Sequence, residues 1–336
     1  MKKTFAIILL SAVLFAACVQ KGGTSQKKGS SGKTLEMLLV ADRDVYAGDT
    51  KQLIDSIFRQ PQMGLPQSEP MFDLVNIPTS SFYNTEMFRV HRNVVVCEIK
   101  EGNPNKAYHY IDRWAAPQVV FELAAASRHA LDSMIEHLAP RIINDMHEAD
   151  YRRIAKAFGG IAGYDLMRKV EQQFGFSLTL SNEFEMANAN NPSPDFAWIR
   201  KEAKDFGIGV LVHVFDYTDA AVFSESNILN RLDTIMRRHV QGSADSSYMA
   251  TERRLDFYTS KASISGSPYA VETRGCWRLF GDFMGGPFVC YTLLDPQQQQ
   301  VIMLTGYVYC PRFDKRDYLM QVDGICHSIS FPTEEK

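Results

Sequence analysis

The chain has 336 residues, of which 45% are hydrophobic and 11% aromatic, and 36 basic residues face 39 acidic ones for a formal net charge of -3. This length and composition allow a sizeable buried core and predict two or three subdomains. Because the basic residues are not in excess, nucleic acid is not expected as a partner.

Residues 1–18, MKKTFAIILLSAVLFAAC, have the layout of a secretory signal. A short basic start precedes an apolar run over residues 5–15, which is too short to span a bilayer. Ala16 and Ala17 before Cys18 resemble the bacterial lipobox, in which the peptide before the cysteine is cut off and the cysteine is acylated. We therefore expect a signal peptide over 1–17 and lipid attachment at Cys18. The alternative is a plain signal peptide with an incidental cysteine.

An acylated cysteine would anchor the protein to a membrane without spanning it. No later run approaches the roughly 20 apolar residues that a second span needs. Val19 and Gln20 follow the anchor where the enteric inner-membrane retention signal has Asp, so we expect delivery to the outer membrane. The next charge is Lys21 and not an acidic cluster, which favours the periplasmic leaflet. Gly, Ser and Lys dominate residues 18–34, which predicts a flexible tether.

Residues 35–158 are predicted to form a first α+β unit. Apolar runs predict strands at 35–40, 72–77, 93–99 and 118–123. Asp49 is expected to begin one helix and Ser127 another, and Pro140 should break or kink the second. The segment LLVADRDV resembles the first motif of haloacid-dehalogenase-like phosphatases through Asp42 and Asp44. That family also needs a distal acidic pair, and Asp282 stands without a second acid, so we expect a solvated loop.

The histidines and cysteines predict no metal site. His147 and Glu148 begin an HExxH-like segment, but Tyr151 stands where zinc would need a second histidine. We expect His129, His137 and His147 to be solvated on their helix. Five cysteines follow Cys18, and their spacings fit no zinc pattern. Buried, reduced thiols are expected, and one disulfide near the C-terminus is the alternative.

Residues 159–242 are predicted to form a second unit. Glycines at 159, 160 and 163 suggest a hinge, followed by a helix from Asp165, strands at 176–180 and 208–215, and a helix from Ser226. This order of helix, strand, strand and helix resembles that of residues 49–138. Residues 243–336 predict an antiparallel meander and a final helix from Asp314 or Lys315. The expected fold class is α+β, with two similar helix-strand-strand-helix units followed by the meander and a C-terminal helix.

Several short pieces of the C-terminal block resemble the domain-of-unknown-function 4837 family of bacterial lipoproteins. They are Arg274-Gly275, Trp277, MGGPF at 284–288, GYVY at 306–309, Pro311 and Lys315-Arg316 with Tyr318. Earlier pieces agree, namely GLPQ at 64–67, Glu69-Pro70 and Arg92-Asn93, so the resemblance would cover nearly the whole mature chain. It implies an envelope lipoprotein without an assigned reaction, and it supplies no catalytic residues.

Aromatic and basic side chains among these pieces suggest a ligand or partner face, because such residues dominate binding surfaces. The candidate residues are Arg274, Trp277, Tyr307, Tyr309, Lys315 and Arg316. Strand alternation places Tyr307 and Tyr309 on one side. The alternative is that this glycine-rich block is a structural turn, since residues 285 and 286 allow conformations that a Cβ would forbid and Pro287 fixes the start of a strand.

The sequence therefore favours a non-enzymatic, lipid-anchored periplasmic protein that binds another envelope component or a small ligand. No catalytic residue, metal or cofactor is assigned. One alternative is a hydrolase acting on an envelope polymer, which a deep pocket with converging acids, or a His beside Ser or Cys, would favour. Another is a structural subunit of an outer-membrane complex.

Overall fold

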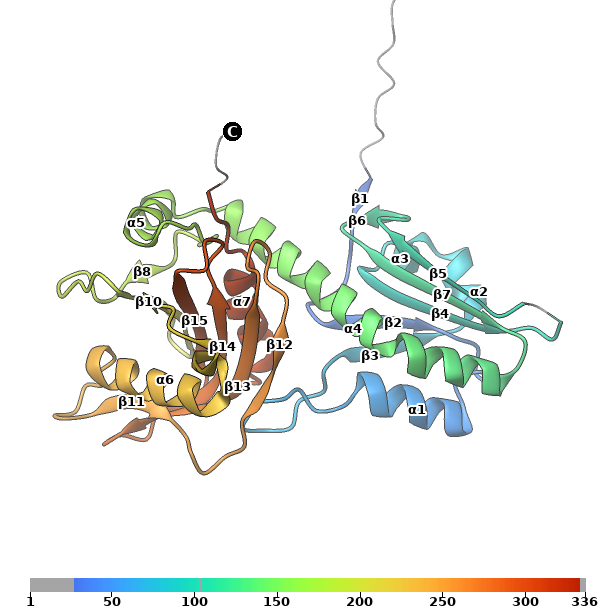
Figure 1. Cartoon of the computed structure of the whole chain (residues 1–336). Helices are drawn as coiled ribbons and strands as arrows, with labels where there is room; N and C mark the ends of the chain where they lie inside the picture. The colour runs from blue at the N-terminus through green and yellow to red at the C-terminus, as the bar shows by residue number, and fades with distance from the viewer. Residues whose placement is uncertain (1–26, 103, 333–336) are drawn as a thin grey trace, which may run out of the picture.

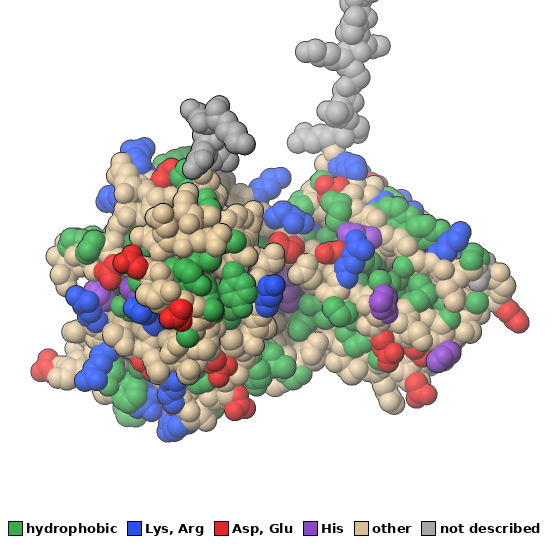
Figure 2. All heavy atoms as spheres, in the orientation of Figure 1, with side chains coloured by type: hydrophobic (Ala, Val, Ile, Leu, Met, Phe, Trp, Pro, Cys, Tyr) green, Lys and Arg blue, Asp and Glu red, His purple; other side chains and the backbone are tan. Residues whose placement is uncertain are grey.

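The structure is a computed structural model that describes residues 27–102 and 104–332. The expected signal peptide, Cys18 and the tether up to residue 26 lie outside the described residues. The chain forms a first unit (27–159) and a second unit (160–332), each with its own sheet. Figure 2 shows the two units as two lobes joined at a waist. Helices and sheets occur in both, which confirms the α+β class.

The first unit is built on a five-stranded sheet in the order β3-β2-β4-β7-β5. The first four strands in this order run parallel, and β5 is antiparallel to β7. The strands are β2 (Glu36–Val40), β3 (Asp73–Ile77), β4 (Asn93–Ile99), β5 (Lys106–Ile111) and β7 (Val119–Ala125). Because both faces of a parallel sheet are covered, β2 and β4 are apolar without alternation.

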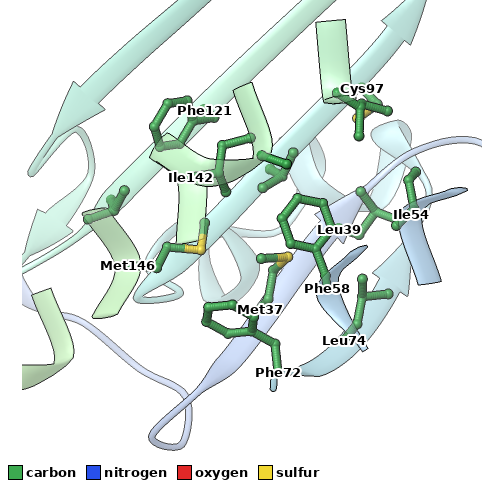
Figure 3. Close-up of a cluster of buried hydrophobic side chains, with 14 of the residues drawn as sticks. Met37, Leu39, Ile54, Phe58, Phe72, Leu74, Cys97, Phe121, Ile142 and Met146 are labelled. Atoms are coloured by element: carbon green, nitrogen blue, oxygen red, sulfur yellow. The ribbon is translucent and has the colours of Figure 1, made fainter. Parts of the chain in front are cut away.

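Helices cover both faces of this sheet. α1 (Gly48–Phe58) and α4 (Arg128–Gly159) pack on one face, and α2 (Thr79–Asn84) and α3 (Glu86–Arg89) lie at the other. Figure 3 shows Leu39 of the sheet packed among Ile54 and Phe58 of α1 and Ile142 and Met146 of α4. The neighbouring residues of β2 point to the opposite core, so the strand is buried from both sides.

α4 extends from the first unit to the second (Figure 1). Ser127 caps it as predicted, since its hydroxyl accepts the N–H of Ala130 at 3.2 Å. Pro140 does not break the helix, contrary to one of the two expectations. Pro140 and Glu136 are both exposed, so water can satisfy the Glu136 carbonyl that Pro140 cannot bond. No described helix has the length and apolarity needed to cross a membrane.

The last residues of the expected tether are held against the first unit. β1 (Lys28–Gly29) pairs with β6 (Ala115–Ala116). Ser31 accepts the N–H of Arg92 and donates its own N–H to Val90, both at 2.9 Å. The prediction of a flexible tether to residue 34 is therefore wrong for 27–34, because backbone hydrogen bonds order a segment that lacks apolar side chains.

The second unit is built on an eight-stranded sheet in the order β11-β13-β14-β15-β10-β9-β8, with β12 also paired to β13, and every pairing is antiparallel. The strands are β8 (Glu185–Met186), β9 (Phe196–Glu202), β10 (Gly207–Asp216), β11 (Tyr248–Thr251), β12 (Tyr258–Ala262), β13 (Ala270–Phe280), β14 (Gly285–Leu294) and β15 (Gln300–Tyr309). The core around α6 (Glu225–His239) lies on one face, with the 3₁₀ turn η1 (Ala220–Phe223) before it. α5 (Tyr164–Phe174) and α7 (Arg316–His327) lie on the other face.

This sheet corrects two expectations. One is the domain boundary between residues 242 and 243, and the other is that the two helix-strand-strand-helix units are similar. β10 pairs with β15 over ten residues, so the meander and the strands before it form one sheet. β10 is buried on both faces and therefore needs a central position. The first unit has a mostly parallel sheet and the second an antiparallel one, so the two halves do not share a plan. The expected strand at 176–180 is irregular, with one isolated bridge from Ser177 to Ser330.

Candidate functional site

The loop between α1 and β3 joins the two units. Glu69 of this loop is buried, and its carboxylate oxygens accept the backbone N–H groups of Lys315 and Arg316 at 2.8 Å each. These two groups lie at the N-terminus of α7, where N–H groups have no partner within the helix and a negative charge is stabilised. Glu69 of the first unit therefore fixes the start of a helix of the second.

Arg316 of the second unit in turn bonds groups of the first unit. Its guanidinium donates to the carbonyl of Pro70 at 2.6 Å and to Asp73 Oδ2 at 2.8 Å. The Arg316 side chain is 8% exposed, so these bonds are shielded from water. A charged side chain from each unit thus pairs with groups of the other.

Gly64 brings the backbone of the same loop against β13. Its φ is +83°, which favours glycine, and a Cβ there would lie 2.8 Å from the Cβ of Arg274. The thiol of Cys276 contacts the Gly64 carbonyl at 3.6 Å. We call the contacts of Gly64, Glu69 and Arg316 the inter-unit seam.

Beside the seam, Arg274 lies at the centre of a buried ion cluster. Its guanidinium donates to Glu272 at 2.7 Å and to Asp323 of α7 at 3.0 Å. Burial raises the pKa of Glu272, but Arg274 and Tyr291 outweigh it and hold that pKa at about 2. Arg274 therefore stays charged and fixed in position between two carboxyl groups.

Tyr291 connects the same two carboxyl groups. Its hydroxyl oxygen lies 2.8 Å from Glu272 Oε2 and 2.9 Å from Asp323 Oδ1. A phenol has one proton to donate, so the second short contact is favourable when a carboxyl carries a proton. Burial raises the pKa of Asp323 to about 6, which makes Asp323 the carboxyl that takes up this proton.

A cleft of about 1000 Å³ opens between the units above this cluster. One wall is α4, and the other consists of residues 258–263, which include all of β12. Glu272, Arg274, Tyr291 and His327 line it from the second unit. This volume is at the upper end of the range for ligand pockets. We call it the inter-unit cleft.

Two histidines and a glutamate lie in the cleft where α4 meets α7. The ring of His327 stacks on Tyr151 with centroids 4.0 Å apart, and His327 Nδ1 lies 3.5 Å from Glu148 Oε1. His147 Nε2 is buried and has no hydrogen-bond partner in the structure. Burial lowers the pKa of both histidines to about 4, so both are neutral at pH 7. Burial also raises the pKa of Glu148.

These groups give the cleft hydrogen-bond donors and acceptors held in fixed positions. Glu272 and Asp323 are engaged by Arg274, so Glu148 and the two neutral imidazoles are the polar groups with unused capacity among them. No group of three or more His, Cys, Asp or Glu side chains that could hold a metal ion occurs within the described ranges. The cleft is equipped to bind a polar ligand, and Glu148 beside His327 could also transfer a proton.

Two protein families match the chain, one for each unit, and the two matches meet close to the boundary between the units. Residues 164–328 match a family described as Domain of unknown function (DUF4837). This half of the chain belongs to the DUF4837 family. Residues 30–159 match a second family, Domain of unknown function (DUF8532). A search among curated proteins gives no significant match.

The DUF4837 match is shorter than the expected coverage of nearly the whole mature chain. The early pieces at 64–67, 69–70 and 92–93 fall in the DUF8532 match. The seam accounts for two of them, because Gly64 contacts Arg274 and Glu69 caps the helix that Arg316 begins, both in the DUF4837 part. The third, Arg92-Asn93, bonds the buried Asp150 carboxylate within the first unit.

The six residues suggested as a ligand or partner face do not lie together on one surface. Tyr309 is half-buried and the other five are buried. Trp277, Tyr307 and Tyr309 do lie together, with ring centroids of Trp277 and Tyr307 5.7 Å apart. These three aromatic side chains point to the α6 side of the eight-stranded sheet. Arg274 points to the α7 side, because positions 274 and 277 lie on opposite faces of the strand.

Each of these side chains has a structural partner. Trp277 Nε1 donates to the Val308 carbonyl at 3.1 Å, and the Tyr307 hydroxyl accepts Trp198 Nε1 at 2.7 Å. Lys315 Nζ donates to the Phe313 carbonyl at 3.0 Å. Of the six, Arg274 alone lines the inter-unit cleft.

Sequence reasoning missed the other polar groups of the cleft. His147 was expected to be solvated, as His129 and His137 are, but its Nε2 is buried under the second unit. Glu272 and Arg274 stand two residues apart in an apolar strand, which is a signal of a buried pair. Asp323 in the apolar face of α7 is a second such signal.

The acidic residues of the phosphatase-like motif do not come together in the structure. Asp42 Oδ1 accepts the N–H of Thr79 at 2.8 Å in the first unit, and Asp282 Oδ1 accepts the N–H of Phe283 at 2.6 Å in a hairpin of the second. All five cysteines after Cys18 are buried and free in the structure. Burial raises the pKa of Cys97 to about 12 and those of Cys276 and Cys290 to about 11, so these thiols are poor nucleophiles.

Proposed function

We propose that the mature protein is a lipid-anchored envelope protein, attached to the outer membrane through Cys18 and facing the periplasm, whose folded body binds an envelope component or small ligand in the inter-unit cleft. The observation that carries the binding role is the cleft of about 1000 Å³ with walls from both units. The anchor rests on the N-terminal sequence and its resemblance to the lipobox.

The seam favours binding because it fixes the two walls of the cleft relative to each other. Glu69 and Arg316 join the units through shielded hydrogen bonds on buried groups. A site whose walls are held before the ligand arrives loses less entropy on binding. Arg274 is likewise held by Glu272 and Asp323, so the floor keeps its shape when the cleft is empty.

Site-specific photo-crosslinking in intact cells tests the binding role. A photoreactive residue in place of Asn144, an exposed residue of α4 that lines the cleft, should form crosslinks to one recurring cell component. The same substitution at Glu171, exposed on α5 away from the cleft lining, is the control and should not. Identical products from both positions, or none from Asn144, would contradict a ligand site in the cleft.

A hydrolase acting on an envelope polymer is the second candidate. It is favoured by Glu148 next to His327 in the cleft, since a carboxyl with a raised pKa beside a neutral imidazole can serve acid-base chemistry. The described residues show no histidine hydrogen-bonded to a Ser or Cys side chain. Release of cell-wall fragments by the purified full chain, abolished in Glu148→Gln, would favour this candidate over simple binding.

A further inference from the structure

β12 forms one wall of the cleft and has a free edge. It pairs with β13 along residues 258–262, and no other described strand pairs with it. An unpaired edge presents backbone N–H and C=O groups that another extended chain can bond. Figure 1 shows β12 at the side of the second unit that faces α4.

Hydrogen bonds of β13 show which groups of β12 point outward. Successive residues of an antiparallel strand direct their N–H and C=O groups alternately to the two neighbouring strands. Leu279 N–H donates to the Met284 carbonyl on the β14 side, so odd-numbered residues of β13 bond β14. The Cys276 carbonyl accepts Glu252 N–H on the opposite side. Even-numbered residues of β13 therefore bond β12.

The partners of these even-numbered residues are Tyr258, Ser260 and Ala262. Thr259 and Lys261 between them direct their backbone groups away from the sheet. Residues of both faces of β12 line the cleft, since every residue from 258 to 263 does so. The cleft therefore surrounds the edge itself, and the outward groups of Thr259 and Lys261 face it.

The opposite wall limits what can occupy this edge. A strand added to β12 would lie about 4.8 Å from it, and α4 stands beyond with Pro140, Ile143 and Asn144 lining the cleft. The volume of about 1000 Å³ is of the size that a single short segment fills, whereas the sheet of a second copy is much larger and would meet α4. A segment of about five residues spans β12 and can form about four backbone hydrogen bonds with Thr259 and Lys261.

The charges of the cleft specify the segment further. Glu148 Oε1 lies 3.5 Å from His327 Nδ1, and because this imidazole is neutral at pH 7 it does not neutralise the carboxylate. Glu225 also lines the cleft, and its carboxylate accepts the hydroxyl of Thr259 at 2.7 Å. These carboxylates favour a basic side chain in the ligand, because neither basic residue of the lining pairs with them: Arg274 bonds Glu272, and Lys261 Nζ lies over the ring of Tyr269.

We propose that the inter-unit cleft binds an extended polypeptide segment that adds as a strand to the free edge of β12 and places a basic side chain near Glu148. This inference rests on the proposed function, since it names the class of ligand for the same cleft. Strand addition supplies affinity through the main chain, and the carboxylates select the sequence.

The probe is a phage-displayed library of random 12-residue peptides, selected on the full chain in detergent. Recovered peptides are synthesised and their Kd is measured by fluorescence anisotropy. We expect peptides with a basic residue, and a loss of affinity of about 3- to 10-fold for each lost backbone bond. Methylating each peptide amide in turn should weaken binding at every second position, because only alternate amides face β12.

Variants of the protein test the same edge. Lys261→Pro removes an outward N–H without removing a bond to β13, and proline is tolerated at such edge positions. It should weaken binding, whereas Lys261→Ala, which keeps the N–H, should not. Glu148→Gln should reduce affinity for the basic peptides and leave that of their Ala-substituted forms unchanged. The methylated peptides give an answer independent of how well Lys261→Pro folds.

Three outcomes would overturn the inference. One is that no peptide binds with a Kd below about 100 μM, which lies in the range of weak association. Another is a flat methylation scan with Lys261→Pro unaffected. The third is a dimer of the purified chain that Lys261→Pro abolishes, because a second copy would then occupy the edge. If any of these outcomes occurs while Asn144 still forms crosslinks in cells, strand addition is rejected and the cleft is still supported as a ligand site.

Discussion

Arg274 brings a positive charge into the floor of the cleft, where Glu272 and Asp323 both bond it. Burial of a charge is unfavourable unless its partners are also present. The cluster therefore makes the cleft floor dependent on all three residues, and removal of the arginine leaves two carboxyl groups buried together.

Replacing Arg274 with Leu should lower the free energy of unfolding by about 3–5 kcal/mol, because one partner of a buried pair is lost. Urea denaturation of the purified protein measures this. Arg254→Leu is the matched control, since the Arg254 side chain is 77% exposed and its partner Glu252 also pairs with Arg278. Equal stabilities of the two variants would contradict the structural role of the cluster.

The pH dependence of stability should reveal the buried histidines. Burial lowers the pKa of His147 from its usual 6.5 to about 4, so between these values the unfolded chain binds more protons than the native one. Stability is therefore lost as pH falls through this window, by roughly 2 kcal/mol per histidine at pH 5 at most. Asp323 opposes part of this loss, because its raised pKa lets the native state take up a proton near pH 6.

His147→Gln should accordingly lose less stability than the unchanged protein between pH 7 and pH 5, by roughly 1–2 kcal/mol in urea titrations. His129→Gln changes an exposed histidine of the same helix and should follow the unchanged protein. Parallel pH profiles for all three proteins would show that His147 is not buried in the native state.

Local residue patterns identify individual residues that the fold requires, but the reason for the requirement can lie in packing, as Gly286 shows. Gly286 was expected to supply an unusual backbone angle, but its φ is not positive, and a Cβ would instead lie 2.0 Å from the Val308 carbonyl. The glycine is required by close approach of β15. Sequence identifies such a glycine, but the reason for it comes from a segment distant in the chain.

At the scale of elements, α7 connects the two units. Its N-terminus is bonded by Glu69 of the first unit, its side chain His327 lines the cleft, and its Asp323 bonds the cleft residue Arg274. Loosening the start of α7 should therefore affect both the seam and the site.

Glu69→Ala should lower the free energy of unfolding by about 2–3 kcal/mol, since two buried N–H groups at the start of α7 lose their acceptor. Hydrogen exchange should show faster exchange in the first turn of α7. Asp317→Asn is the control, because Asp317 also contacts Arg316 but is 51% exposed. A change in stability no larger than that of the control would argue against the seam.

Most strands and helices could be predicted from apolar periodicity, including β4 with its observed bounds and the antiparallel meander that contains β13, β14 and β15. β5 (Lys106–Ile111) was missed because its side chains are largely exposed and its composition is polar. Residues 176–180 have the apolar alternation of a strand but lack a continuous partner, so their side chains are buried in irregular structure.

At the scale of the whole molecule, sheet pairing and the seam depend on contacts between distant residues. Glu69 and Arg316 are 247 positions apart, and β10 joins the later meander across more than 80 residues. No local pattern contains such pairings, which is why the duplication was expected and the cleft was not.

Metabolic labelling with an alkyne fatty acid tests the central claim, that an acylated Cys18 holds this binding body at the envelope. The account predicts label on the mature protein and, for Cys18→Ser, loss of label and release from the membrane fraction. An unlabelled protein, or a Cys18→Ser variant that still fractionates with membranes, would contradict it.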